Sequence, residues 1–399
     1  MRIRGRNRLL SKGRHRGHVL ATEVEVRHPG GELYGSDRVM LELVTAWARK
    51  GHGVSLALGE AGPLEGELTR RGLDYELIPM PVLRGEILRP RRLPGFLLDI
   101  LQDLVRGLVD RQRGRGPARY ISTLTMPSQV IASRLAGRHT VLHVHEAEIS
   151  RPKLVRAVLS ASALCANTVI ANSRFTKDVL LDSWPHLKHK VEVVYNPIDV
   201  PNPMPVALPS RRPEELKLLY LGRLSERKGV DLAVRTVIEL LNRGLPVQLT
   251  IVGSAFRGNE DFEIGLRKLV ARNKVDNKIR FQGFVPDVGS FVAENHMVMV
   301  PSQREESYGN VAAEAALAGR FVAVADHTGL HEVTKDLSAA LRVSDMTPVA
   351  WADAITTLWE RWEGYQQLIE SDQETLKLRH DPITISKMAA DCIAMANPQ

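Results

Sequence analysis

The stretch KLLYLGRLSERKGVDLAV, Lys217–Val234, predicts a strand, a tight turn and the beginning of a helix. It follows PNPMPVALPSRRPEE, Pro201–Glu215, whose prolines indicate a linker. After this linker, strands at 247–254 and 278–284 alternate with helices at 230–244 and 262–275. A strand–helix pattern that begins anew after a linker predicts a second α/β domain.

The same alternation occurs before the linker. A β-branched strand over 18–26 precedes an amphipathic helix over 37–52, which ends at Lys50-Gly51. Strands that alternate with helices predict parallel sheets covered on both faces. Further strands of this half are predicted at 53–59, 75–80, 119–124, 140–146, 168–173 and 191–197.

The predicted fold class is therefore α/β, with two Rossmann-like, doubly wound domains that face each other across a cleft. Ligands of such sheets bind at the carboxyl ends of the strands, so we expect the site there. The predicted organisation is a basic tail at 1–16, an N-terminal domain at 17–200, a linker at 201–215, a C-terminal domain at 216–375, and a C-terminal helix at 376–399 that packs back on the N-terminal domain.

The composition is that of a soluble globular protein, with 399 residues, 44% hydrophobic and 25% charged. This length fits two domains. The two cysteines, Cys165 and Cys392, are far apart and argue against a disulfide framework or a zinc site. No run reaches the 18 or so apolar residues that a membrane span needs. We expect a cytoplasmic protein. The same protein can attach peripherally to the inner face of the membrane.

Positive charge is concentrated at the N-terminus. The net charge is +8, and the first sixteen residues contain seven Lys or Arg and no acid. Such a tail binds anionic lipid headgroups or nucleic-acid phosphates, or is a solvated end. With 5% aromatic residues and no nucleic-acid-binding signature, we expect no nucleic-acid partner. The cationic stretch Pro79–Phe96 adds to the indication of a membrane-associated acceptor, and its alternative is a loop that covers the N-terminal domain.

The turn after the strand at 217–221 has the composition of an anion site. Gly222 permits a tight turn, and Arg223 and Lys228 are cations five residues apart before a helix begins. Two cations with the amides of a helix start suit a diphosphate. The alternative is a loop with solvent-facing charges. The spacing does not match a P-loop.

A second stretch, EESYGNVAAEAALAGR at Glu305–Arg320, combines acids, a turn and an apolar helix. Glu306 and Glu314 are eight residues apart, and carboxylates accept hydrogen bonds from pairs of sugar hydroxyls. The alternative for Glu314 is an acid that stabilises the helix dipole. Backbone amides of the turn add phosphate donors, and the predicted binding segment is Tyr308, Gly309, Asn310 and Val311.

Together these motifs resemble the retaining glycosyltransferases of family 4, which have the GT-B fold. The resemblance rests on GRLSERKG, the Glu306-x7-Glu314 pair and RFQGFVP. It also rests on HPGGELYGSDRVMLELVTAWARKGHGV near the N-terminus, and on ANSRFTKDVL before VVYNPID. It covers nearly the whole chain.

The resemblance implies specific roles. Arg223 and Lys228 would bind the donor diphosphate, Glu314 the ribose hydroxyls and Glu306 the transferred sugar. The N-terminal domain would bind the acceptor, and the C-terminal domain the nucleotide sugar. Gly30 and Gly31 would let the first loop approach the phosphates and the acceptor. His145 would lie near the donor sugar, its alternative being a packed residue at a strand end. The implied catalytic set is Arg223, Lys228, Glu306 and His145.

One segment departs from the family pattern. Where the family often has GGxxE, this chain reads DHTGLHEV at Asp326–Val333, which keeps Glu332 and has one glycine fewer. The loop near the donor sugar is then expected to differ.

The predicted function is transfer of a hexose, with retention, from a UDP- or GDP-sugar to a glycan or lipid-linked acceptor in cell-envelope or exopolysaccharide synthesis. No metal, cofactor or protein nucleophile is expected. One rival is a catalytically silent nucleotide-sugar-binding protein. A phosphorylase would need a pyridoxal lysine and a longer chain, and a nucleic-acid binder would rest on the tail alone.

Overall fold

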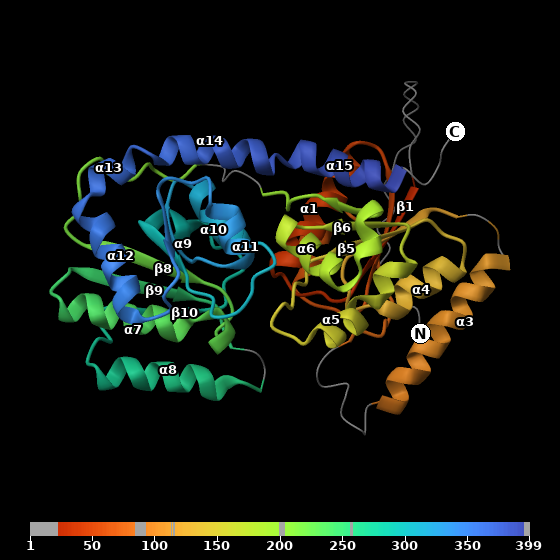
Figure 1. Cartoon of the computed structure of the whole chain (residues 1–399), viewed down its shortest axis with the longest axis horizontal. Coiled ribbons are helices and arrows are strands. Elements are labelled where there is room, and N and C mark those ends of the chain that lie inside the picture. Colours follow the sequence, from red (N-terminus) through yellow and green to blue (C-terminus); the bar gives the residue numbers. More distant parts are fainter. Residues whose placement is uncertain are drawn as a thin grey trace. The chain divides into compact units, whose positions relative to one another are not determined.

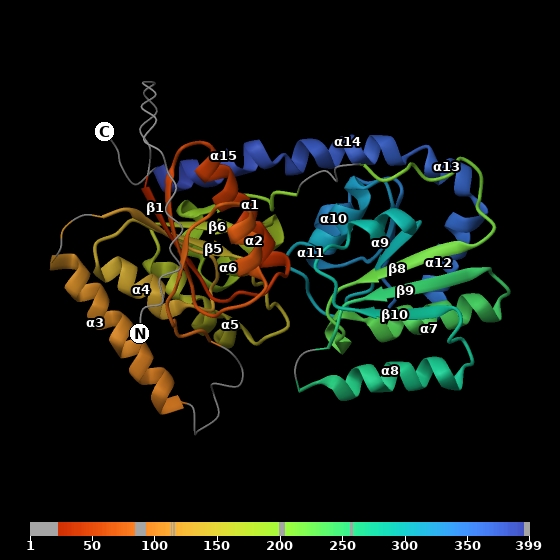
Figure 2. The same ribbon diagram turned by 180° about the vertical axis from the view of Figure 1, so that it is seen from behind.

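A computed structural model of the chain describes residues 23–83, 93–112, 114, 116–198, 204–255 and 258–394. They form two compact units (Figures 1 and 2). The first unit comprises the described residues up to Pro197 and those from Pro382 on, and the second is Ile198–Asp381. The predicted basic tail at 1–16 and linker residues 201–203 lie outside the described residues.

The first unit is built on a seven-stranded sheet of order β3-β2-β1-β4-β5-β6-β7, and every neighbouring pair is parallel. Its strands are β1 (Glu23–His28), β2 (Gly53–Leu58), β3 (Tyr75–Leu77), β4 (Ala118–Ile121), β5 (Thr140–Val144), β6 (Thr168–Ala171) and β7 (Val191–Val193). Its helices are α1 (Gly35–Arg49), α2 (Leu64–Arg70), α3 (Leu93–Gln112), α4 (Pro127–Leu135), α5 (Lys153–Ser160), η2 (Ala161–Cys165), α6 (Arg174–Ser183), η3 (Pro185–His189) and α15 (Pro382–Ala394).

Two apolar clusters cover the two faces of this sheet. One joins the strands to α1, α2 and α15, and the other joins them to α4, η2 and α6. Because both faces are buried, the central strands are nearly continuous apolar runs, as in β6, where every residue is buried.

The C-terminal segment joins the first unit through α15. The Trp47 indole N–H of α1 donates a 3.0 Å hydrogen bond to the Ser386 carbonyl oxygen of α15, and Cys392 and Ile393 belong to the same apolar cluster. In both views α1 and α15 lie side by side (Figures 1 and 2). The segment predicted as one helix at 376–399 is instead divided at Asp381, because Pro382 cannot continue the preceding helix.

The second unit is built on a six-stranded parallel sheet of order β10-β9-β8-β11-β12-β13. Its strands are β8 (Leu216–Leu221), β9 (Val247–Val252), β10 (Ile279–Gly283), β11 (Met297–Val300), β12 (Phe321–Ala325) and β13 (Ala340–Val343). Its helices are η4 (Glu226–Lys228), α7 (Val230–Asn242), α8 (Glu260–Arg272), α9 (Gly289–Glu294), α10 (Asn310–Leu317), α11 (Thr328–Thr334), α12 (Pro348–Glu360), α13 (Trp362–Gln366) and α14 (Ile369–His380).

Each sheet reverses its strand order once. In the first unit the reversal lies between β1 and β4, and in the second between β8 and β11. At such a switch point the loops after two neighbouring strands diverge to opposite faces and leave a crevice, where ligands of doubly wound sheets bind. The strand order therefore predicts that ligands bind at the loops after β8 and β11, and at the loops after β1 and β4.

Candidate functional site

The turn after β8 is built for close approach of backbone. Gly222 has φ 150° and its N–H donates to the Val252 carbonyl oxygen at 3.0 Å. A side chain on Gly253, which ends the neighbouring strand, would collide with the Gly222 carbonyl oxygen at 1.8 Å. The Tyr220 hydroxyl donates to the Arg223 carbonyl oxygen at 2.9 Å. Burial raises the pKa of Tyr220, which keeps this donor protonated. The turn that presents Arg223 is thus fixed from both sides.

The loops after β8 and β11 are joined to each other. Gly229 adopts φ 67°, and a side chain there would lie 1.8 Å from the Pro301 carbonyl oxygen. The Gln303 N–H donates to the Arg227 carbonyl oxygen at 2.9 Å, and the Arg227 guanidinium donates to the Glu305 carbonyl oxygen at 2.7 Å. Two segments about 75 residues apart in sequence therefore form one surface at the switch point.

Lys228 and Glu306 form an ion pair on this surface. The Lys228 ammonium lies 2.6 Å from Glu306 Oε1, which also accepts a 2.7 Å hydrogen bond from the Ser302 hydroxyl. Burial alone would raise the pKa of Glu306, but the positive charge of Lys228 holds it below the ordinary value. Glu306 is therefore an ionised acceptor beside a cation. The structure brings these two predicted site residues into direct contact.

Helix α10, which begins four residues after Glu306, has one narrow accessible face. Gly309 precedes it with φ 115°, where a side chain would meet Leu330 at 2.6 Å. Asn310, Val311 and Glu314 are partly exposed, while the remaining residues of α10 are buried. Asn310 and Val311 come four and three residues before Glu314, so each is a neighbour of Glu314 on the helix surface. The three predicted residues therefore form one strip.

The side chain of Tyr308 faces the core. Its ring is buried, and its hydroxyl lies 2.6 Å from His380 Nε2 of α14. The predicted binding contribution of this residue thus concerns its backbone, while its side chain connects α10 to α14.

The segment that departs from the family pattern carries a strained backbone. Thr328 has φ 54°, a conformation that a β-branched residue rarely adopts. Its hydroxyl accepts a 3.1 Å hydrogen bond from the Glu306 N–H. The next residue must be glycine, because a side chain on Gly329 would collide with the Tyr308 nitrogen at 2.5 Å. Thr328 thus supports the backbone of Glu306 at the cost of strain.

In the first unit His145 directly follows β5 and is partly buried. Its Nδ1 lies 3.5 Å from the Asn172 amide nitrogen, and its ring stacks on His143 at 4.0 Å between centroids. Its buried Nε2 has no hydrogen-bond partner among the described residues. Burial, with a smaller contribution from His28, lowers the pKa of His145 to about 3. The imidazole is therefore neutral at physiological pH.

The two glycines of the predicted first loop, Gly30 and Gly31, have different surroundings. Gly31 packs on the loop after β2, where a side chain would lie 2.5 Å from the Gly62 nitrogen, and its carbonyl oxygen accepts from the Leu64 N–H at 2.8 Å. A side chain on Gly30 would meet no atom within 4 Å. Packing against the loop after β2 thus requires glycine at position 31, whereas the space around Gly30 could hold a side chain.

A buried polar series at the first switch point was missed by the sequence reasoning. His28, at the end of β1, lies 2.6 Å from the Ser122 hydroxyl after β4 and 2.7 Å from Asp37 Oδ1 of α1. The distances match a Ser-His-Asp triad, but all three residues are buried. Asp37 also accepts the Tyr34 N–H at 2.8 Å. The series therefore ties β1, β4 and the start of α1 together.

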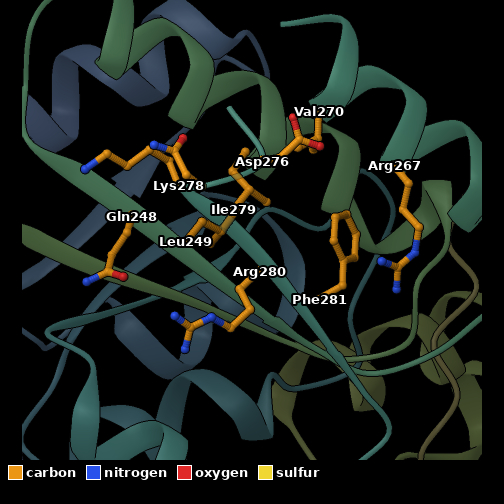
Figure 3. Close-up of a pocket in the computed structure, with 10 residues that line it drawn as sticks. Gln248, Leu249, Arg267, Val270, Asp276, Lys278, Ile279, Arg280 and Phe281 are labelled. Carbon is orange, nitrogen blue, oxygen red and sulfur yellow. The ribbon is translucent and has the colours of Figure 1, made fainter. Parts of the chain in front are cut away.

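One pocket of the second unit lies away from these loops. It is lined by residues from the first half of β9, from α8 and from the beginning of β10, with the Arg267 guanidinium 4.4 Å from the centroid of the Phe281 ring (Figure 3). Its Lys278 pairs with Glu215 at 2.7 Å. This pocket is at the edge strand, so it does not extend the site at the switch point.

No group of three or more His, Cys, Asp or Glu in the described ranges has a metal-binding arrangement. Within the same ranges, no helix has the length and apolarity that crossing a bilayer requires.

Two family models match the chain on either side of the linker. Residues 34–201 match "Glycosyltransferase Family 4", and residues 215–361 match "Glycosyl transferases group 1". The chain belongs to the family 4 glycosyltransferases. The match over residues 215–361 contains Arg223, Lys228, Glu306 and Glu314, and the match over residues 34–201 contains His145.

Relatives of this glycosyltransferase include D-inositol 3-phosphate glycosyltransferase of Nocardia farcinica. It is 27% identical over 368 residues, which are 86% of this chain and 76% of the relative. An uncharacterized glycosyltransferase of Methanocaldococcus jannaschii is 28% identical over 57% of this chain and 62% of its own length. These identities support the family and leave the substrates open.

Solved structures show the same fold. The Anabaena protein Alr3699/HepE, crystallised with UDP and glucose, has a TM-score of 0.77 at 19% identity and covers 93% of this chain and 99% of its own. WaaG, a glycosyltransferase involved in lipopolysaccharide biosynthesis, has a TM-score of 0.69 at 15% identity over 93% and 99%. The predicted GT-B fold with two Rossmann-like domains is thereby confirmed.

Proposed function

We propose that this glycosyltransferase moves a hexose, with retention, from a nucleoside diphosphate sugar to a glycan or lipid-linked acceptor in cell-envelope or exopolysaccharide synthesis. The observation that carries the proposal is the Lys228–Glu306 pair at the second switch point, in the loop that leads into α10. A cation and an acid held together suit a ligand that has both phosphates and hydroxyl groups.

The leaving diphosphate sets the electrostatic requirement. Charge develops on the β-phosphate as the glycosidic bond breaks, and fixed cations and amides aimed at it lower the barrier. Lys228 ends η4, two residues before α7 begins, and Arg223 comes from a turn that its neighbours hold in place. These cations perform the task that a divalent metal performs in other transferases, so we propose a metal-independent reaction without a cofactor.

Retention is proposed without a protein nucleophile. Glu306 is the carboxylate beside the cation, but its Oε1 already accepts bonds from Lys228 and Ser302. A carboxylate held in this way accepts hydrogen bonds from the hydroxyl groups of the sugar better than it attacks a carbon atom. Leaving-group stabilisation with attack of the acceptor from the same face fits this arrangement.

For the donor we propose a UDP- or GDP-sugar. Glu314, on the accessible face of α10, would accept from the ribose hydroxyls. The Anabaena protein of the same fold was crystallised with UDP-glucose, which supports UDP as the first nucleotide to test.

The acceptor is proposed to have an apolar part. The first unit contains a cavity of about 270 Å³ whose apolar lining is Leu83, Leu124, Val155, Leu159, Val179 and Leu180. Glu146, next to His145, also lines it. The cations at its rim are paired, Arg151 with Glu148 and Arg156 with Asp182. A rim with balanced charge favours a neutral apolar group over a phosphate.

The test is a donor screen by thermal shift across UDP- and GDP-sugars, followed by transfer to a glycan and to a lipid-linked acceptor. NMR of the product gives its anomeric configuration. Retained configuration with activity that survives a chelator supports the proposal. Donor binding without turnover on any acceptor would favour the alternative, a catalytically silent nucleotide-sugar-binding protein, and an inverted product would refute retention.

A further inference from the structure

The Glu306 carboxylate is held through one of its two oxygen atoms. Its Oε1 accepts from the Lys228 ammonium at 2.6 Å and from the Ser302 hydroxyl at 2.7 Å. Among the described residues both donors to this carboxylate therefore lie on Oε1, which leaves Oε2 to a ligand. The side chain is 12% exposed, so its orientation depends on the residues packed around it.

The loop after β12 holds the main chain of Glu306 on both sides of the residue. The Glu306 N–H donates to the Thr328 hydroxyl oxygen at 3.1 Å, and the Glu306 carbonyl oxygen accepts from the Gly329 N–H at 2.9 Å. Thr328 and Gly329 begin α11. Two neighbouring loops, after β11 and β12, thus share the support of one residue.

His327, the residue that precedes α11, connects the groups that hold the carboxylate and the main chain. Its Nε2 lies 2.8 Å from the Ser302 carbonyl oxygen, and its Nδ1 lies 3.1 Å from the Thr328 hydroxyl oxygen. Because a carbonyl oxygen can only accept, Nε2 must carry a proton. In the tautomer with its proton on Nε2, Nδ1 accepts from the Thr328 hydroxyl.

These hydrogen bonds form a closed series that begins and ends at one residue. We name it the Glu306 series, and its members are Glu306, Thr328, His327 and Ser302. Every donor in the series points in the same direction around it, from the Glu306 N–H to Glu306 Oε1, and hydrogen bonds arranged in this way polarise one another. The main chain and the carboxylate of Glu306 are therefore fixed together.

The series depends on the residue at which this chain departs from the family pattern. Thr328 stands at the first glycine of GGxxE. Glycine would adopt the φ of 54° found there without strain, but it has no hydroxyl to connect His327 with the Glu306 N–H. A strained backbone persists where its surroundings hold it, and such residues cluster at functional sites.

We propose that His327 is a positioning residue of the donor site, which fixes the Glu306 carboxylate for the hydroxyl groups of the transferred sugar. This inference rests on the proposed role of Glu306 and adds a residue that acts through Glu306 without touching the ligand. A carboxylate that is fixed before the sugar arrives loses less freedom when the sugar binds. The alternative is a series that only joins the loops after β11 and β12.

The experiment is calorimetric titration of the full chain with each UDP- and GDP-sugar of the donor screen and with UDP and GDP alone. His327→Asn ends near the place of Nδ1 and cannot reach the Ser302 carbonyl. It should weaken nucleotide-sugar binding about fivefold, the effect of one hydrogen bond, and leave UDP and GDP binding unchanged. His327→Gln places an amide N–H near the position of Nε2 and should recover most of this loss.

The matched control is His331→Asn. It removes another imidazole from α11, one whose side chain is 55% exposed and pairs with Asp326, and it should change the binding of neither ligand class. A lower Tm of His327→Asn with unchanged ligand affinities would assign the series to loop stability and overturn the proposal. Equal weakening of nucleotide and nucleotide sugar would overturn it as well.

A double variant tests whether His327 acts through Glu306. Adding His327→Asn to Glu306→Gln should have little further effect on nucleotide-sugar binding, because the carboxylate that the series fixes is already gone. Two independent, additive losses would contradict the proposal. If Glu306→Gln itself leaves nucleotide-sugar binding and sugar transfer unchanged, the proposed role of Glu306 fails and this inference with it. An effect of Glu306→Gln without one of His327→Asn refutes the inference alone.

Discussion

The Lys228–Glu306 pair gives the sharpest test of the donor site. Lys228→Ala removes the cation and leaves the Glu306 carboxylate with the Ser302 hydroxyl alone. Glu306→Gln keeps an acceptor for Ser302 but releases Lys228 from its partner. If the roles are as proposed, Lys228→Ala should weaken nucleoside diphosphate binding and Glu306→Gln should not, although both variants break the same ion pair.

The expected loss of stability depends on how far the side chains of Lys228 and Glu306 are exposed to water. Breaking a fully buried pair costs ~3–5 kcal/mol, but the Lys228 side chain is 33% exposed and that of Glu306 12%. Water therefore replaces part of the lost interaction, and we expect Lys228→Ala to destabilise the protein by about 1.5 kcal/mol. Because both variants lose one shared interaction, the double variant should cost less than the sum, by roughly 1 kcal/mol.

Nucleotide binding distinguishes the proposed role of Lys228 from that of Glu306. Calorimetric titration with UDP and GDP should show at least tenfold weaker binding for Lys228→Ala, about 1.4 kcal/mol, because a phosphate partner is lost. Glu306→Gln should bind the free nucleotide as well as wild type or better, while sugar transfer falls. Lys228→Arg, which keeps the charge, should recover part of the affinity. Equal weakening of nucleotide binding in both single variants, or no change in either, would refute the assignment.

Variants at three further positions test other parts of the site. Glu314→Gln should weaken nucleotide binding by roughly 1.5–3 kcal/mol with little change in Tm, whereas Glu360→Gln at the end of α12 should change neither. Thr328→Ala should melt below Thr328→Gly, because both lose the bond to the Glu306 N–H but only glycine relieves the positive φ, which costs ~1–2 kcal/mol. His145 has a folded pKa of about 3 against 6.5 when unfolded, so the unfolded chain binds the extra proton between these values and stability falls as pH is lowered from 6.5 towards 3. His145→Asn should flatten that slope in urea titrations; an unchanged slope would contradict the burial of this imidazole.

The second unit could be predicted from its sequence because its motifs are local. The strand, the glycine turn and the helix start at 217–234 are each encoded within a few residues, and so is the spacing of Glu306 and Glu314. A parallel sheet then places the ends of β8 and β11 together. Periodicity and turn chemistry, together with the resemblance to family 4, selected the residues that lie on this surface, and their roles stay predictions.

Contacts between distant segments could not be predicted in this way. The series of His28, Asp37 and Ser122 depends on β1 and β4 being neighbours, and no local pattern marks Ser122. The burial of Tyr308 against His380 depends on how α14 packs. The exposure of Leu97, Leu101 and Leu108 on α3 could not be predicted for the opposite reason, because periodic apolar residues in a sequence ordinarily indicate a face turned to the core.

The position of Glu314 in α10 bears on one of its two interpretations, the acid that stabilises the helix dipole. The helix dipole acts on charges within the first turn, and Glu314 is the fifth residue of α10, which begins at Asn310. An acid there gains little from the dipole. Its neighbours on either side, Ala313 and Ala315, are buried, yet Glu314 faces the accessible strip with Asn310. The helix dipole therefore gives little reason for a carboxylate at this position, and the binding of ribose hydroxyls by Glu314 stays the prediction that Glu314→Gln tests.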